Sequence, residues 1–204
     1  MLYIALVLTG LALVHLGDPV SIKRIPVAKP LVWAAGMGLI IYGTIASSFS
    51  EPKFSVYTWG VVVGWLLLAL SGTLVLISLF INLPFWKTYV STGASDRLVT
   101  TGLYSLTRHP GVLSTVVLVA SVVLVSRSYV VLFAAPLVIT LDVLLVTIQD
   151  RLFFGRMFEG YGDYRSETPM FVPNRRSIRA FALWLRQASP ARCAKGESSD
   201  FQLG

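Results

Sequence analysis

Long uncharged apolar runs are the feature of this chain that most constrains its fold. A helix rises about 1.5 Å per residue, so about 20 apolar residues cross the hydrocarbon core of a bilayer. Charged residues make up only 13% of the 204 residues, whereas a soluble domain carries about a quarter. We therefore expect an all-α, polytopic membrane protein. The runs predict about five transmembrane helices, over residues 2–16, 30–49, 57–83, 111–126 and 129–148.

Basic residues predict the orientation of these helices. If five helices alternate across the membrane, 15 of the 17 Lys and Arg residues fall on one side, and only Lys53 and Arg127 fall on the other. Basic loops stay in the cytoplasm and attract anionic lipid headgroups. We therefore expect a cytoplasmic C-terminus in an inner or plasma membrane. No basic motif interleaved with aromatic residues occurs, so membrane lipids rather than nucleic acid are the expected partners.

Charge and hydropathy divide the chain into three parts. Residues 1–95 contain the first three predicted helices, and residues 96–173 contain the last two and a cytoplasmic segment after them. Residues 174–204 form a basic tail. The tail begins with a predicted amphipathic helix over residues 174–186, which would lie on the leaflet surface, and ends in a polar stretch expected to be disordered. Cys193 is the only cysteine, which excludes disulfides and multi-thiolate metal sites within one chain, so we expect no metal.

Two stretches of polar and aromatic residues flank the last two predicted helices. One is residues 101–110, which ends in Arg-His-Pro, and the other runs from Gln149 to Pro173. Only residues 126–128 separate the two helices, so the helices form a hairpin and both stretches emerge on the same side. Taken singly, each polar side chain is explained as an interfacial anchor or a solvated helix end. Taken together, they predict one cytoplasmic pocket formed by Tyr104, Arg108, His109, Asp150, Tyr161 and Tyr164.

The two stretches form a specific pattern over about residues 98–173. It reads Gly-Leu-Tyr, three residues, Arg-His-Pro, a helical hairpin, an acidic helix end, Tyr-x-x-Tyr and Pro-x-Phe-x-Pro. This pattern resembles the integral-membrane methyltransferases, which include isoprenylcysteine carboxyl methyltransferases and bacterial phospholipid methyltransferases. The resemblance implies an enzyme that moves a methyl group from S-adenosylmethionine to a lipophilic acceptor. The acceptor stays open between a lipid amine, a prenyl-cysteine-like carboxylate and another hydrophobic nucleophile.

The resemblance also implies which residues hold the cofactor. His109 and the backbone around Pro110 would contact it, and Asp150 would hold its ammonium group. Gln149 stands where the family has the first of two acids. In addition, an arginine suits the carboxylate of the cofactor, and tyrosine faces suit its sulfonium. The expected cofactor-binding set is therefore Tyr104, Arg108, His109, Pro110, Gln149, Asp150, Tyr161 and Tyr164.

A carboxyl group also lies inside the fifth predicted helix. Asp142 precedes the acidic helix end by two turns and shares its face. A carboxyl at that depth costs about 2.5–3.5 kcal/mol on insertion scales, so it faces the bundle interior. Asp142 either lines the lipid-substrate cavity as a base for a protonated amine acceptor, or bonds a neighbouring helix through Ser114, Thr115 or Ser121. On the first hypothesis, Asp142 and Arg108 are the residues expected to take part in the reaction.

Departures from the family pattern leave other functions open. Gly111-Val112 follows Arg-His-Pro, where the family has a bulky residue and a tyrosine, and Leu145 replaces an arginine on the last helix. A haem-binding protein of the nitrite-regulation and carotene-isomerase type would use His15 and His109 as its two ligands. An NADPH-dependent sterol-type reductase would share the Tyr…Arg-His-Pro stretch. A scaffold without chemistry would keep only the fold.

Small residues in two predicted helices indicate close packing. Gly36 and Gly38 lie in the second helix, and Gly60 and Gly64 lie in the third. The Gly-x-x-x-Gly spacing of the second pair lets helix backbones approach each other. We expect these glycines to pack helices within one chain, and the oligomeric state stays open.

Overall fold

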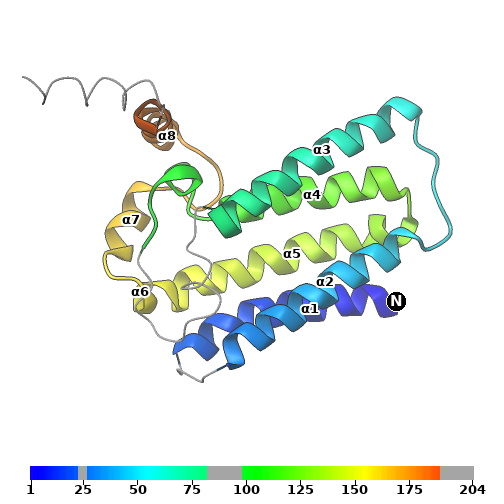
Figure 1. Ribbon diagram of the computed structural model, residues 1–204, viewed down its shortest axis with the longest axis horizontal. Coiled ribbons are helices and arrows are strands. Elements are labelled where there is room, and N and C mark those ends of the chain that lie inside the picture. The colour runs from blue at the N-terminus through cyan, green and yellow to red at the C-terminus, as the bar shows by residue number, and fades with distance from the viewer. Residues whose placement is uncertain (23–26, 82–97, 189–204) are drawn as a thin grey trace, which may run out of the picture.

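Five long helices make up the body of the protein (Figure 1). The structure is a computed structural model that describes residues 1–22, 27–81 and 98–188. The regular elements of these residues are helical, apart from an isolated bridge between Lys53 and Ser128. The all-α prediction is therefore confirmed. The long helices are α1 (Leu2–Ile22), α2 (Ala28–Ser48), α3 (Thr58–Leu76), α4 (Pro110–Ser126) and α5 (Tyr129–Leu152), and a π-helical turn (Ile77–Ile81) follows α3.

The five helices run side by side along the long axis and alternate in direction (Figure 1). α1 packs against α2 and α3 packs against α4, so the bundle contains two antiparallel helix pairs. α5 lies between the two pairs and contacts α1, α2 and α4. The C-terminal ends of α1, α3 and α5 therefore share one end of the bundle with the N-terminal ends of α2 and α4. As a result, the segment that follows α5 meets the segment that precedes α4.

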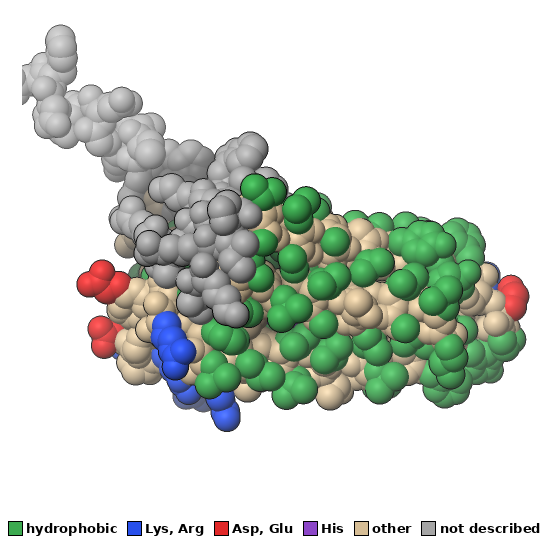
Figure 2. Space-filling model, turned by 90° about the horizontal axis from the view of Figure 1, so that it is seen from below, with side chains coloured by type: hydrophobic (Ala, Val, Ile, Leu, Met, Phe, Trp, Pro, Cys, Tyr) green, Lys and Arg blue, Asp and Glu red, His purple; other side chains and the backbone are tan. Residues whose placement is uncertain are grey.

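Within the described ranges, three helices are long and apolar enough to cross a membrane, over Ala28–Ser48, Thr58–Leu79 and Tyr129–Leu152. Apolar side chains lie along the face of the bundle that Figure 2 shows, as expected of the lipid-facing surface of an integral membrane protein. Two of the five predicted spans are shorter, namely α4 and the apolar part of α1, Leu2–Gly17. α1 continues to Ile22, beyond the predicted run, because hydropathy marks lipid contact whereas the helical backbone extends past it.

Basic side chains gather at the end of the bundle where α5 finishes (Figure 2). Lys53 and Arg127 are the two residues assigned to the opposite side by helix alternation. They do lie together at the other end, where the Phe54 N–H donates to the Arg127 carbonyl over 2.7 Å. Among the described residues, these two basic residues therefore lie at the opposite end of the bundle from the basic side chains near the end of α5.

Glycines let neighbouring helices approach closely. A Cβ added at Gly36 of α2 would lie 2.8 Å from the Gly10 carbonyl oxygen of α1. A Cβ at Gly64 of α3 would lie 2.9 Å from the Leu124 Cβ of α4. The close packing of both helix pairs, α1 with α2 and α3 with α4, therefore depends on a glycine at the contact. Gly38 plays no such part, because nothing lies within 4 Å of its missing side chain.

Three short helices cap the basic end of the bundle: α6 (Phe154–Met157), α7 (Tyr161–Glu167) and α8 (Arg175–Ala188). A 3-10 turn, η3 (Gly102–Ser105), precedes α4 and contacts α8. α8 lies across the long axis and is seen end-on in Figure 1. It is the predicted amphipathic helix, and its Ile178 and Leu185 are 52% and 49% exposed. The polar end of the tail, with Cys193, lies outside the described residues.

Candidate functional site

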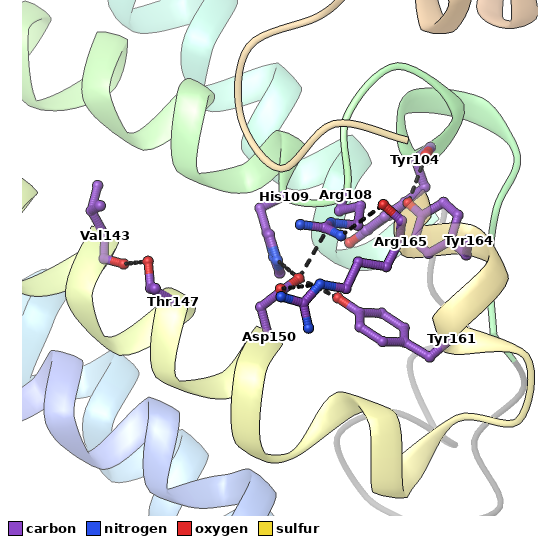
Figure 3. Close-up of polar contacts among 9 residues, drawn as sticks. All are labelled: Tyr104, Arg108, His109, Val143, Thr147, Asp150, Tyr161, Tyr164 and Arg165. Atoms are coloured by element: carbon purple, nitrogen blue, oxygen red, sulfur yellow. Dashed lines mark hydrogen bonds and ion pairs between the residues drawn. The ribbon is translucent and has the colours of Figure 1, made fainter. Parts of the chain in front are cut away.

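The centre of the candidate site is the carboxylate of Asp150, in the last turn of α5 and only 2% exposed (Figure 3). His109 Nε2 lies 3.1 Å from its Oδ1, and the Tyr161 hydroxyl donates to the same oxygen. Arg108 Nε lies 3.3 Å from Oδ1, and Arg165 Nε lies 3.9 Å from Oδ2. A buried charge is tolerated where such partners surround it. The site is therefore held together by one anion that joins α5, α7 and the segment before α4.

Local sequence explains why Arg108 and His109 stand where they do. Pro110 begins α4, as proline suits the first helical position. It also disfavours helical backbone at the preceding residue, and His109 has an extended φ of −128°. The Arg108 and His109 N–H groups donate to the Pro169 and Met170 carbonyls over 2.9 and 3.2 Å. The Arg-His-Pro stretch is thus joined by its backbone to the Pro-x-Phe-x-Pro segment.

Aromatic rings fix the orientation of the His109 imidazole. The Phe154 ring stacks on it at 5.7 Å between centroids, and the Phe171 ring lies at 5.9 Å. Phe154 also meets the Tyr161 ring edge-on at 5.7 Å. Together with the Asp150 carboxylate, these contacts leave the imidazole little freedom to turn. The two phenylalanines were not predicted as site residues, although Phe171 is part of the sequence pattern.

Two tyrosines of the site, Tyr104 and Tyr164, form a chain of hydrogen bonds beside the Asp150 cluster. The Tyr164 hydroxyl donates to the Tyr104 carbonyl over 2.7 Å, and the Tyr104 hydroxyl donates to the Ser78 carbonyl over 3.3 Å. This chain links α7, η3 and the π-helical turn after α3. Burial raises the pKa of all three site tyrosines, and the hydrogen bond to the Asp150 carboxylate raises that of Tyr161 further. The tyrosines therefore stay protonated and neutral at physiological pH.

A cavity of about 410 Å³ opens beside this cluster and extends between the helices of the bundle. Its walls are mostly apolar, and residues of α1 and α2 contribute to them although the first 95 residues carry no recognisable motif. Asp150 is not among the residues that line it, whereas its partners Arg108, His109 and Tyr161 are. The other predicted cofactor-binding residues all line the cavity: Tyr104, Arg108, His109, Pro110, Gln149, Tyr161 and Tyr164.

Asp142 lines another part of the same cavity and is 8% exposed. Its Oδ1 lies 3.4 Å from His15 Nε2, on α1. Asp142 thus does bond a neighbouring helix, but its partner is His15 of α1 and not the predicted Ser114, Thr115 or Ser121 of α4. The Ser114 and Ser121 hydroxyls donate within α4, to the Pro110 and Val117 carbonyls. The sequence suggests His15 only as a haem ligand. Asp142 itself is the signal for this pair, because a carboxylate inside a membrane needs a polar partner.

Arg165 is a further site residue that the sequence predictions did not include. Arg165 of α7 faces the Asp150 carboxylate, and its backbone carbonyl accepts a hydrogen bond from Arg108 Nη1 over 3.2 Å. Its position directly after Tyr-x-x-Tyr would have been a signal for it. Among the described residues, no group of three or more His, Cys, Asp or Glu side chains could hold a metal ion.

Comparison with protein families gives a match to part of the chain. Residues 59–159 match the family described as phospholipid methyltransferase, which implies methyltransferase activity. The match includes the Arg-His-Pro stretch, Asp142 and Asp150, and it ends before Tyr161 and Tyr164. Comparison with curated proteins and with solved structures found no match, and the haem and reductase hypotheses gain no support. Through this segment, the chain belongs to the phospholipid methyltransferase family of integral-membrane methyltransferases.

Proposed function

We propose that this protein transfers a methyl group from S-adenosylmethionine to a lipophilic acceptor in the membrane. The observation that supports this most is the cavity of about 410 Å³, which joins the Arg108–His109 cluster to apolar walls inside the bundle. The family supplies the reaction class, and the cavity offers a polar cofactor and an apolar acceptor a common site. Its volume lies within the range of about 300–1,000 Å³ typical of small-molecule sites.

The polar residues of the cavity fit the chemistry of S-adenosylmethionine, which carries a carboxylate, an ammonium group and a cationic sulfonium. Arg108 would hold the carboxylate through charge-assisted hydrogen bonds. Neutral tyrosine rings would attract the sulfonium by cation–π interaction, worth about 0.5–2 kcal/mol. The full set proposed to contact the cofactor is Tyr104, Arg108, His109, Pro110, Gln149, Tyr161 and Tyr164.

Asp150 acts on the cofactor through its neighbours. Its carboxylate is enclosed by Arg108, His109 and Tyr161, and a direct contact with the cofactor's ammonium group would require one of these donors to move. We therefore assign Asp150 the role of a positioning residue, which holds the three side chains at the edge of the cavity. This role replaces the direct contact expected from the family pattern.

Methyl transfer depends mainly on the relative placement of the two reactants and on the exclusion of water from the site. When bound, S-adenosylmethionine supplies an electrophilic methyl group on its sulfur. Arg108 and His109 hold the polar end of the site in a fixed geometry, and the apolar walls exclude water. Asp142 is the one carboxylate among the described residues that line the cavity, so it would attract a cationic acceptor such as an amine. Residues 96–173 would form the methyltransferase core, and α1 and α2 would complete the acceptor side.

The proposed orientation places the active-site end in the cytoplasm. Five bundle helices span the membrane in this arrangement, and the basic end lies inside, as basic loops do. α8, across the bundle axis, would rest on the inner leaflet with its exposed apolar side chains in lipid. A membrane-impermeant maleimide should then label Cys193 in inside-out vesicles and not in sealed right-side-out ones. In a Cys193→Ser background, Lys53→Cys should show the reverse, and labelling of both from the same side would contradict the orientation.

Binding of S-adenosylmethionine to purified protein in detergent tests the cofactor assignment. Calorimetry should show binding by the wild type and at least about tenfold weaker binding by His109→Ala, because hydrogen bonds in charged networks contribute about 1.5–3 kcal/mol. Arg151→Ala is the matched control, since Arg151 is exposed, follows Asp150 directly and does not line the cavity. A folded wild type that binds no S-adenosylmethionine would remove the proposed function.

A further inference from the structure

His15 and Asp142 form a polar pair in the apolar part of the cavity. His15 Nε2 lies 3.4 Å from Asp142 Oδ1, and the side chains are only 13% and 11% exposed. The residues are 127 positions apart, and His15 on α1 lies outside the segment that matches the family. Both side chains line the cavity that Arg108 and His109 line as well. The pair therefore stands in the acceptor part of the proposed site.

The hydrogen-bonding of the His15 ring leaves one nitrogen for a ligand. When the Asp142 carboxylate is the acceptor of this hydrogen bond, His15 Nε2 carries the shared proton. The neutral ring then has a lone pair on Nδ1, and this buried atom has no partner among the described residues. A buried nitrogen without a partner lowers stability, which a purely structural histidine would avoid. The ring is therefore arranged to accept one more hydrogen.

We propose that His15 is the base of the methyl-transfer reaction and that Asp142 is its positioning residue. This inference rests on the proposed function and deepens it. A protonated amine acceptor gives a proton to His15 Nδ1, which frees the lone pair of its nitrogen. This lone pair forms a bond to the methyl carbon, and the electron pair of the carbon–sulfur bond leaves with the sulfur. The positive charge lost from sulfur then lies on the methylated amine, and the charge of the original ammonium lies on the imidazolium, which the Asp142 carboxylate stabilises.

This assignment defines the acceptor by its chemistry. A base is needed where a proton occupies the lone pair of the attacking atom, as in a protonated amine, whereas an ionised carboxylate has no proton to give. Lys29 of α2 and Arg108 also line the cavity, so Asp142 is the group among its described lining residues that favours a positive charge on His15. The His15–Asp142 pair therefore selects a proton-bearing head group on an apolar chain.

Nuclear magnetic resonance of the two histidine rings tests the assignment directly. The chain has only two histidines, so 15N-histidine labelling gives two ring systems, and the His15→Gln variant identifies each. In full-length protein in lipid nanodiscs, His15 Nδ1 should be unprotonated. Adding dodecylamine should shift its resonance, and adding dodecanoate should not. A resting ring that is protonated at Nδ1, or equal shifts with the two probes, would overturn the proposal.

Two variants separate this step from cofactor binding. His15→Gln should bind S-adenosylmethionine within about twofold of wild type, yet transfer labelled methyl to dodecylamine at least about a hundredfold more slowly, as loss of a base predicts. Asp142→Asn should likewise keep S-adenosylmethionine binding and slow methyl transfer, with the proton of the His15 ring moved to Nδ1. Wild-type transfer rates in His15→Gln would refute its role as the base. A wild type that does not bind S-adenosylmethionine would instead refute the proposed function. The protonation state measured for the His15 ring would not be affected by that result.

Discussion

Replacing Asp150 with alanine should abolish S-adenosylmethionine binding and lower the free energy of unfolding by about 3–5 kcal/mol. The variant leaves Arg108, which is only 8% exposed, without its anion, and it removes the hydrogen-bond acceptor of His109 and Tyr161. The segment before α4 then loses its link to α5. Calorimetry measures the loss of binding, and denaturant titration followed by tryptophan fluorescence measures the loss of stability.

Two companion variants show whether the effect comes from the buried charge. Asp150→Asn keeps the size of the side chain and removes its charge, so it should lose most of the same binding energy. Arg165→Ala removes a partner whose side chain is 49% exposed and 3.9 Å away, and exposed ion pairs contribute about 0–1 kcal/mol. Wild-type binding by Asp150→Ala would show that the cluster does not organise the site.

Alanine at Gly36 should lower the free energy of unfolding by about 1–3 kcal/mol, as overpacking does. Its Cβ would lie 2.8 Å from the Gly10 carbonyl oxygen, a backbone atom that can move only if α1 and α2 separate. Alanine at Gly38, two residues away on the same helix, meets nothing within 4 Å. This second variant should gain about 0.5–1 kcal/mol, because alanine favours the helix over glycine.

Thermal unfolding in detergent, followed by circular dichroism, measures both glycine variants. The expected result is a pair of changes of opposite sign from the same substitution in the same helix. Equal effects at Gly36 and Gly38 would mean that helix propensity alone decides, and that α1 and α2 are not in close contact in solution.

Hydropathy and helix signals predicted the helices well. The five apolar runs became α1 to α5, and α4 begins at Pro110, one residue before the predicted run, because apolar length and proline chemistry act locally. The glycine prediction held for Gly36 and Gly64 only, since Gly38 meets nothing and Gly60 faces Val56 of the segment just before its own helix. Which glycine faces a neighbour depends on the rotation of the helix, and local sequence does not encode that rotation.

The candidate site was predictable where chain topology decides proximity. A hairpin brings both of its flanks together, so the neighbourhood of His109, Asp150 and Tyr161 followed from the order of the segments. The pairing of His15 with Asp142 depends on how α1 packs against α5, and nothing in the sequence between them specifies that contact. The enclosure of Asp150 likewise arises only when α7 folds back with Arg165.

The two backbone hydrogen bonds from residues 108 and 109 to residues 169 and 170 set an order of events during biosynthesis. The ribosome makes α1 to α5 before α7 and the segment that supplies Tyr161 and Phe171. The bundle helices can therefore insert and pack while the Asp150 carboxylate still lacks its partners from α7. A nascent chain therefore has no complete Asp150 cluster until these late residues emerge, and on the proposed function membrane insertion would precede the ability to react.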